Sequence, residues 1–171
     1  MILIFAVDEN WNMAYKGEKL AEISLDLKRF KELTEGQIII IGRRTWDAVV
    51  GRDEPLPNRT NILMTRNKDY EEKGFISANS IPNLLETLNE INLDDKKVFL
   101  AGGQDLVEQL INRCNKAYIT KILKTYDEGD KGMVNLDELD DWEIVKESEV
   151  FEEDGIRFKF VDYTRLPKIK L

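Results

Sequence analysis

Short hydrophobic runs alternate along the chain with segments whose apolar residues recur at helical spacing. Residues 37–41 hold four consecutive isoleucines, and a β-branched run bounded by glycines is typical of a strand buried on both faces. Residues 1–7 form a similar apolar run at the start of the chain. Together the apolar runs predict strands over residues 1–7, 37–41, 60–65, 75–78, 98–101 and 117–123.

The segments between these strands predict helices. Leu27, Phe30 and Leu33 lie at helical spacing, and we expect Leu27 and Phe30 to face the core. Ser80 is a typical N-terminal cap, and Pro82 suits the first turn that follows it. The predicted helices cover residues 25–34, 45–50, 80–89 and 105–112.

The last third of the chain predicts an antiparallel hairpin. Its arms would be residues 143–151 and 156–163, joined by the turn Glu153-Asp154-Gly155. Strands that alternate with helices favour a largely parallel sheet covered on both faces. We therefore expect one α/β domain over residues 1–171, with a mixed, mostly parallel sheet of about eight strands and about four helices. Ligands of such sheets bind beyond the carboxyl ends of the strands.

Composition then excludes several kinds of chemistry. The 171 residues include no histidine and one cysteine, Cys114. A Ser-His-Asp hydrolase, a His-ligated zinc site, an internal disulfide and a four-cysteine metal site are all excluded. A partial calcium-binding loop at residues 127–138 is rejected because Gly129 and Lys131 stand where ligands are needed, so we expect no metal. Proton transfer near neutral pH must then use a carboxyl group, a lysine, a tyrosine or water.

The net charge of −8 is unevenly distributed. Residues 126–155 carry 13 Asp and Glu against two lysines, a net charge of −11, which leaves +3 on the rest. The main body can therefore receive an anionic ligand, whereas the acidic segment reads most simply as a solvated flank. Net acidity argues against a nucleic-acid partner. No apolar run reaches the roughly 20 residues of a membrane span, and the apolar N-terminus lacks signal-peptide features, so we expect a cytoplasmic protein.

Three polar segments directly follow predicted strands. Gly102-Gly103-Gln104-Asp105 would let phosphate oxygens approach backbone N–H groups at the start of a helix. Ile41-Gly42-Arg43-Arg44-Thr45-Trp46 and Met64-Thr65-Arg66-Asn67 place cations and hydroxyls after two other strands. Taken singly, each is open to a simpler interpretation as a tight turn or as solvated arginines. Because the carboxyl ends of parallel strands share one edge, their convergence predicts a dinucleotide phosphate site.

Asp26 is the candidate acid-base residue. It lies beside the apolar face of the predicted helix 25–34. A carboxylate in an apolar cleft has a raised pKa and can bind a cationic or amidine-like heterocycle. The alternative is an ordinary aspartate in the first turn of a helix, and spacing alone favours it.

Together these segments resemble dihydrofolate reductases of the bacterial chromosomal type, over almost the whole chain. The order and spacing of the segments carry the resemblance more than any one of them. The resemblance implies hydride transfer from NADPH to 7,8-dihydrofolate, a place in one-carbon metabolism, inhibition by antifolates and a monomer. The matching segments are Ile4–Asp8, Leu25–Lys31, Ile41–Trp46, Pro55–Asn61, Leu100–Gly103, Tyr118–Thr120 and Glu128–Asp130.

On the substrate side, the resemblance assigns the main roles to Asp26, Thr120 and Arg59. Asp26 would hydrogen-bond the pterin 2-amino group and ring nitrogen and favour protonation of the neighbouring ring nitrogen, while Thr120 supports the carboxylate. Arg59 would pair with the glutamate carboxylate of the substrate. The other implied substrate contacts are Ile4, Phe5, Leu27, Phe30, Val49, Val50, Leu56 and Leu100, with Ile4 and Leu100 acting through backbone carbonyls.

On the cofactor side, the resemblance implies three groups of residues. An extra phosphate on the ribose calls for cations, which explains NADPH in preference to NADH. The family often has a cis peptide bond at the glycine pair. The implied contacts are Ala6, Met13 and Ala14 at the nicotinamide; Gly42, Arg43, Arg44, Thr45, Thr65 and Arg66 at the adenosine and its phosphate; and Leu100, Gly102, Gly103, Gln104, Asp105 and Leu106 around the pyrophosphate.

The chain departs from the family's pattern in the loop before Asp26. Leu20-Ala21 replaces a proline and tryptophan, Met13-Ala14 replaces Ile-Gly, and Leu106 stands in place of a tyrosine. We therefore expect weaker binding of diaminopyrimidine antifolates than is usual for bacterial members. Two alternatives stay open: a related pyrimidine reductase of riboflavin synthesis, and a dinucleotide-binding module without activity.

Overall fold

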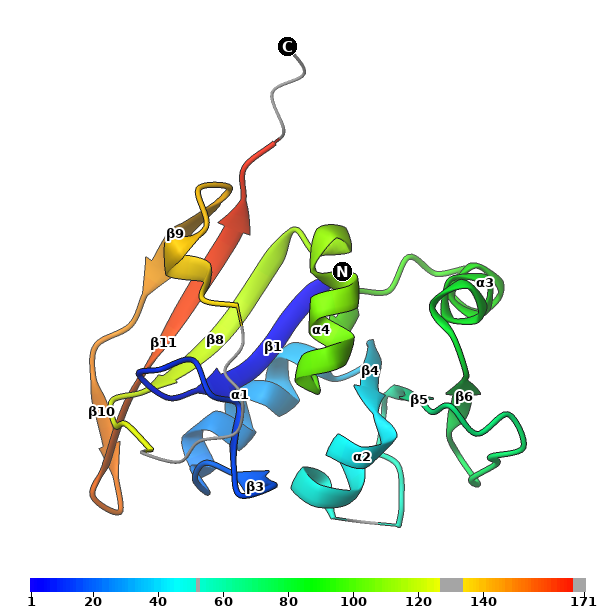
Figure 1. Ribbon diagram of the computed structural model, residues 1–171, viewed down its shortest axis with the longest axis horizontal. Coiled ribbons are helices and arrows are strands. Elements are labelled where there is room, and N and C mark those ends of the chain that lie inside the picture. Colours follow the sequence, from blue (N-terminus) through cyan, green and yellow to red (C-terminus); the bar gives the residue numbers. More distant parts are fainter. Residues whose placement is uncertain (52, 127–133, 168–171) are drawn as a thin grey trace.

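The computed structural model describes residues 1–51, 53–126 and 134–167 (Figure 1). Its central sheet has the strand order β10-β11-β8-β1-β7-β4-β5-β6, and β9 also pairs with β11. Strands β1 and β4 to β8 pair in parallel, and β11 is antiparallel to its neighbours, which confirms the expected mixed sheet. The strands are β1 (Ile2–Val7), β4 (Ile38–Gly42), β5 (Thr60–Met64), β6 (Ile76–Ala78), β7 (Val98–Leu100), β8 (Lys116–Ile122), β9 (Trp142–Glu147), β10 (Phe151–Glu153) and β11 (Ile156–Arg165).

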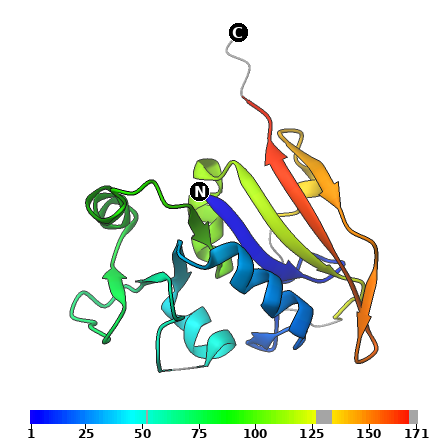
Figure 2. The same cartoon turned by 180° about the vertical axis from the view of Figure 1, so that it is seen from behind.

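In the part of the chain that the structure describes, four α-helices accompany the sheet. They are α1 (Ser24–Thr34), α2 (Arg43–Thr45), α3 (Ile81–Ile91) and α4 (Gln104–Leu110). Figures 1 and 2, seen from opposite sides, show α1 and α4 on opposite faces of the sheet, as predicted. The Ser80 hydroxyl accepts a hydrogen bond from the Asn83 backbone N–H and caps α3. Among the described residues, no helix is both long and apolar enough to span a membrane.

The isoleucine run of β4 joins two separate parts of the core. Ile38 and Ile40 pack in the cluster that includes Leu106, Val107 and Leu110 of α4. Ile39 packs on the other face, in the cluster that Phe30 and Leu33 of α1 contact. Successive side chains of a strand point to opposite faces, so a strand between two helical layers needs apolar residues at every position.

The expectation that Leu27 faces the core is wrong. Its side chain is 52% exposed, although Phe30 and Leu33 on the same helix are packed against the core. The inward stripe of α1 runs through positions 26, 29, 30 and 33, which are neighbours on one helical face. A carboxylate and a guanidinium occupy two of these positions, so the apolar pattern alone placed Leu27 inside.

The predicted first arm of the hairpin is two strands, β9 and β10. Between them Ser148 interrupts the ladder, because its hydroxyl accepts a hydrogen bond from the Phe160 backbone N–H. The turn before Ile156 is where it was predicted, with Glu153 paired to Ile156. A small hairpin of β2 (Ala14–Tyr15) and β3 (Glu18–Lys19) was not predicted. The segments Glu128–Asp130 and 127–133 of the rejected calcium loop lie outside the described residues.

Candidate active site

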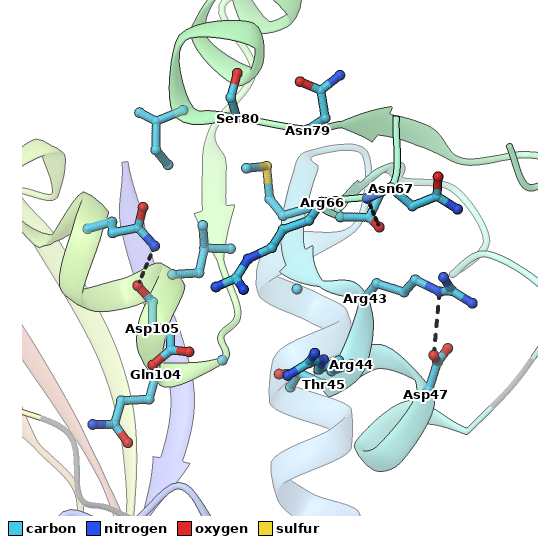
Figure 3. Close-up of a pocket in the computed structure, with 17 residues that line it drawn as sticks. Arg43, Arg44, Thr45, Asp47, Arg66, Asn67, Asn79, Ser80, Gln104 and Asp105 are labelled. Atoms are coloured by element: carbon cyan, nitrogen blue, oxygen red, sulfur yellow. Dashed lines mark hydrogen bonds and ion pairs between the residues drawn. The ribbon is translucent and has the colours of Figure 1, made fainter. Parts of the chain in front are cut away.

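The three polar segments that follow β4, β5 and β7 line one cavity of about 620 Å³ (Figure 3). The cavity opens beyond the carboxyl ends of these strands, where α/β sheets bind their ligands. Ten of the residues predicted for the cofactor line it: Gly42, Arg43, Arg44, Thr45, Thr65, Arg66, Gly103, Gln104, Asp105 and Leu106.

The arginines of this cavity are not equivalent. In Figure 3 the Arg66 side chain reaches into the cavity, whereas Arg43 extends toward Asp47. The Nε atom of Arg43 lies 3.6 Å from Asp47 Oδ2, and its guanidinium lies 4.1 Å from the ring centroid of Tyr70. Asp47 was not predicted, although a carboxylate four residues after an arginine on a helix is a usual pairing signal.

The glycine pair makes close contacts that a side chain would block. A Cβ atom on Gly103 would lie 2.4 Å from Thr45 Oγ1, and one on Gly102 would lie 2.9 Å from Met13 Cε. Gly102 also has a φ of +117° and accepts a hydrogen bond from the Gly42 backbone N–H. A cis peptide bond joins the two glycines, as the resemblance led us to expect. Gly103 therefore brings backbone without a side chain to the wall of the cavity that the arginines line, an arrangement that fits the phosphates of NADPH.

A second, much smaller cavity, of about 30 Å³, contains Asp26. The Thr120 hydroxyl donates a 2.5 Å hydrogen bond to Asp26 Oδ1. Burial raises the pKa of Asp26 above its ordinary value, and the Thr120 hydrogen bond and the charge of Arg29 partly offset that rise. Asp26 does lie in the first turn of α1, but its carboxylate is buried in the small cavity and is not solvated. The cavity is lined by Ile4, Phe5, Asp26, Arg29, Phe30, Leu33, Tyr118 and Thr120.

Arg59 lies at the far end of α1 from Asp26. Its Nε atom donates to Thr34 Oγ1 at 2.9 Å, and its Nη1 atom donates to the Pro57 carbonyl at 2.7 Å. Eight residues of helix separate Asp26 from Thr34, about 12 Å at 1.5 Å per residue. An elongated substrate lying along α1 would meet a carboxylate at one end and a guanidinium at the other.

Several predicted residues line neither cavity. Leu56 and Val50 pack in a cluster beside Ala101, and Leu100 is fully buried in the core on the α4 side. Met13 reaches the glycine pair through its terminal methyl group. The predicted residues outside both cavities are Ala6, Met13, Ala14, Leu27, Val49, Val50, Leu56, Arg59, Leu100 and Gly102.

Some lining residues were not predicted although periodicity points to them. Arg29 and Leu33 lie three and seven residues after Asp26 on α1, and Tyr118 lies two residues before Thr120 on β8. These spacings place side chains on the same face of a helix or strand. Met64 and Asn67, which flank Thr65 and Arg66 in the third predicted segment, also line the large cavity. The missed residues are Arg29, Leu33 and Tyr118 in the small cavity, and Asp47, Asn79, Ser80, Ile81 and Gln109 in the large one.

An arginine-lined cavity at the carboxyl edge of an α/β sheet, beside a partly buried carboxylate, is typical of enzymes that bind a nucleotide cofactor next to a small substrate. Comparison with known proteins identifies the family within this class of enzymes. The family model described as dihydrofolate reductase matches residues 1–165. The chain therefore belongs to the dihydrofolate reductase family.

Individual relatives agree with this family. The chain is 32% identical over 168 residues to the dihydrofolate reductase of Buchnera aphidicola subsp. Baizongia pistaciae (strain Bp), covering 98% of this chain and 97% of the relative. It is 33% identical over 142 residues to the enzyme of Bacillus subtilis (strain 168), covering 83% and 79%. A solved structure of dihydrofolate reductase from Enterococcus faecalis, complexed with NADP(H) and RAB-propyl, superposes with a TM-score of 0.81 at 29% identity, covering 96% of this chain and 95% of that one.

Family membership identifies the chain as an oxidoreductase that reduces dihydrofolate with NADPH. The two alternatives, a pyrimidine reductase and a module without activity, are not favoured.

Proposed function

We propose that the two cavities bind the two reactants in the reduction of dihydrofolate. The small cavity, with room for only an edge of a ring, marks where the pterin meets Asp26, and the large cavity receives the adenosine and phosphates of NADPH, which supplies the hydride when bound. Arg44 and Arg66 would hold the anionic phosphates, and the exposed backbone of Gly103 would hold the pyrophosphate. The observation that carries this proposal is the Asp26–Thr120 pair in an apolar cleft next to the arginine-lined cavity.

Asp26 would orient the pterin and make its protonation favourable. Thr120 occupies Oδ1 of the carboxylate, so Oδ2 stays available to accept hydrogen bonds from the 2-amino group and ring nitrogen of the substrate. A buried negative charge favours a positive charge on the neighbouring ring nitrogen, and water can deliver that proton. Phe30 and Leu33 exclude other water from this end of the site, which strengthens these interactions.

Asp26→Asn tests this assignment. Oxidation of NADPH by dihydrofolate, followed as the loss of absorbance at about 340 nm, should slow by about 10²–10⁴-fold at neutral pH. The loss should be smaller at low pH, where the substrate is protonated without help. NADPH affinity should not change, because Asp26 lies in the other cavity. Glu32→Gln, an exposed carboxylate on the same helix, is the matched control. Unchanged turnover of Asp26→Asn at neutral pH would refute the role of Asp26.

We also propose that the protein is a cytoplasmic monomer. Cys114 is a buried free thiol, which suits a reducing compartment. Light scattering after size exclusion should give a mass near 19.9 kDa. A mass of twice that value would contradict the monomer.

We further propose weakened binding of diaminopyrimidine antifolates. Ala21 stands where the family places a tryptophan, and it packs in the cluster of Leu20, Ile23 and Phe158 instead of presenting a large ring to the site. A trimethoprim dissociation constant in the low nanomolar range, measured by calorimetry with NADPH present, would contradict this expectation.

A further inference from the structure

Arg29 is a charged side chain in the Asp26 cavity that the proposed mechanism does not use. It lies three residues after Asp26 on α1, so both side chains project from the same helical face. Its Nη2 atom donates a 2.5 Å hydrogen bond to Asp162 Oδ1, and each partner's side chain is only 20% exposed. Its guanidinium also lies 4.5 Å from the ring centroid of Phe160 and 5.5 Å from that of Tyr118.

The sheet under α1 fixes this arrangement. In the antiparallel pairing of β8 and β11, Thr120 is opposite Phe160, and Tyr118 is opposite Asp162. Residues two apart on a strand, and residues opposite each other on neighbouring strands, share one face of a sheet. Two polar pairs therefore lie side by side beneath α1. One joins Asp26 to Thr120, and the other joins Arg29 to Asp162.

Among the described residues that line this cavity, Arg29 is the charged side chain that accompanies Asp26. From β1 the cavity receives Ile4 and Phe5, which carry no charge. From β8 it receives Tyr118 and Thr120, whose side chains carry hydroxyl groups. Asp162 of β11 is the carboxylate paired with Arg29. Burial has the largest effect on the pKa of Asp26 and raises it, and the charge of Arg29 acts in the opposite direction.

We propose that Arg29, clamped by Asp162, is a positioning residue for the reaction: its guanidinium opposes part of the effect of burial and so favours the anionic form of the Asp26 carboxyl, which binds the pterin. This inference rests on the proposed function of Asp26 and extends it. The ionic pair acts through Asp26 and does not contact the cofactor cavity. Asp162 limits the effect of Arg29, because it partly neutralises the guanidinium and holds it in one place.

The test uses substitutions with opposite expected signs. Arg29→Gln removes the cation and leaves Asp162 uncompensated, so the pKa of Asp26 should rise. Asp162→Asn removes the anion and leaves Arg29 uncompensated, so that pKa should fall. The double variant should return close to the wild-type value. The carboxyl carbon resonance of Asp26 in protein labelled with 13C-aspartate reads this directly without substrate or cofactor, and Asp26→Asn identifies the resonance.

The pH profile of hydride transfer is the second readout. A reaction that needs a proton slows as pH rises above the apparent pKa of the site. On that falling limb the Arg29→Gln enzyme should be about three- to tenfold faster, relative to its own low-pH plateau, than the wild type. The Asp162→Asn enzyme should be slower by a similar factor. Lys28→Met is the matched control, because Lys28 is an exposed cation on the same helix that pairs with Glu32.

The outcomes separate this inference from the function on which it rests. Opposite shifts of the Asp26 resonance together with opposite shifts of the pH profile support the inference. Shifts of the resonance in the same direction, or no shifts, would mean that the pair is only a structural tie between α1 and β11, and would overturn it. An Asp26→Asn variant with full activity would refute the proposed function, and with it the role of Arg29 in the reaction, even if the opposite shifts of the resonance remained.

Discussion

Two close contacts between single residues determine the geometry of this site. Thr120 holds one oxygen of Asp26, and Gly103 brings the main chain against Thr45. The first contact fixes the position of the Asp26 carboxylate, and the second brings the backbone of Gly103 to the wall of the cavity. A threonine hydroxyl makes each contact, so a small change of side-chain volume at either place should have a large effect.

Gly103→Ala should destabilise the protein because of this crowding. A Cβ atom would lie 2.4 Å from Thr45 Oγ1, well inside contact distance. Overpacking of this kind costs about 1–3 kcal/mol, and thermal unfolding should show a melting temperature lower by several degrees. NADPH binding, measured by fluorescence titration, should weaken at the same time.

Two further variants show whether the clash is the cause. At Gly42 the nearest atom to an added Cβ is 3.6 Å away, so Gly42→Ala should keep a melting temperature close to that of the wild type. Removal of the hydroxyl in Gly103→Ala/Thr45→Ala should restore most of the lost stability. If Gly103→Ala melts at the wild-type temperature, the crowding argument is wrong.

At the scale of elements, α1 depends on a distant hairpin for its N-terminal cap. Ile23, the residue at the N-cap position, has no side chain that can cap the helix. The carboxylate of Glu153 caps it instead. It accepts hydrogen bonds from the Ser24 backbone N–H at 2.7 Å, the Ser24 hydroxyl at 2.5 Å and the Leu25 backbone N–H at 3.3 Å. The turn between β10 and β11 thereby fixes the end of the helix that carries Asp26 and Arg29.

Glu153→Gln should lower stability only above the pH range in which this carboxyl titrates. The hydrogen bonds from Ser24 lower the pKa of Glu153 below 4.5 in the folded protein. A group with a lowered folded pKa stabilises the protein above its unfolded pKa, and that contribution is lost as pH falls through the folded value. At pH 7 the melting temperature should drop by roughly 2 °C, and the difference should shrink at pH 3. Glu152→Gln, the exposed neighbour, is the matched control and should keep the wild-type melting temperature at pH 7.

The elements were largely predictable because each carries a local signal. The apolar runs located β1, β4, β5, β7 and β8, and Ser80 located the start of α3. The break between β9 and β10 was not predictable, because it depends on a hydrogen bond between Ser148 and a residue of another strand.

The site, like the elements, was predictable where the sequence carries a signal for it. Segments that directly follow strands were brought together as expected, because parallel topology alone determines where they meet. Arg29 and Asp162 were missed because no spacing in the sequence relates a residue of α1 to one of β11, 133 positions apart.

At the scale of the whole molecule, the net charge of −8 opposes the binding of an anionic cofactor, whereas the local charge favours it. The order of the strands in the sheet places the acidic strands away from the cavity. β9 and β10, which belong to the acidic segment, lie at the β11 edge, and the cavity lies beyond β7, β4, β5 and β6. Four strand spacings of about 4.8 Å separate β10 from β7, the nearest of these strands, roughly 19 Å, or about two Debye lengths at 0.1 M salt. Figure 1 shows the same separation along its horizontal axis.

The sign of the salt dependence of NADPH binding therefore tests which charge matters. If the arginines of the cavity dominate, salt screens an attraction, and the dissociation constant should rise by about three- to tenfold between roughly 20 and 300 mM salt. NADH lacks the extra phosphate, so its affinity should depend less on salt. If the net charge dominated, salt would screen a repulsion and NADPH would bind more tightly. Arg66→Gln should weaken the salt dependence for NADPH, because Figure 3 shows the Arg66 side chain reaching into the cavity. Calorimetry over a salt series measures the three dependences: NADPH with the wild type, NADH with the wild type, and NADPH with Arg66→Gln.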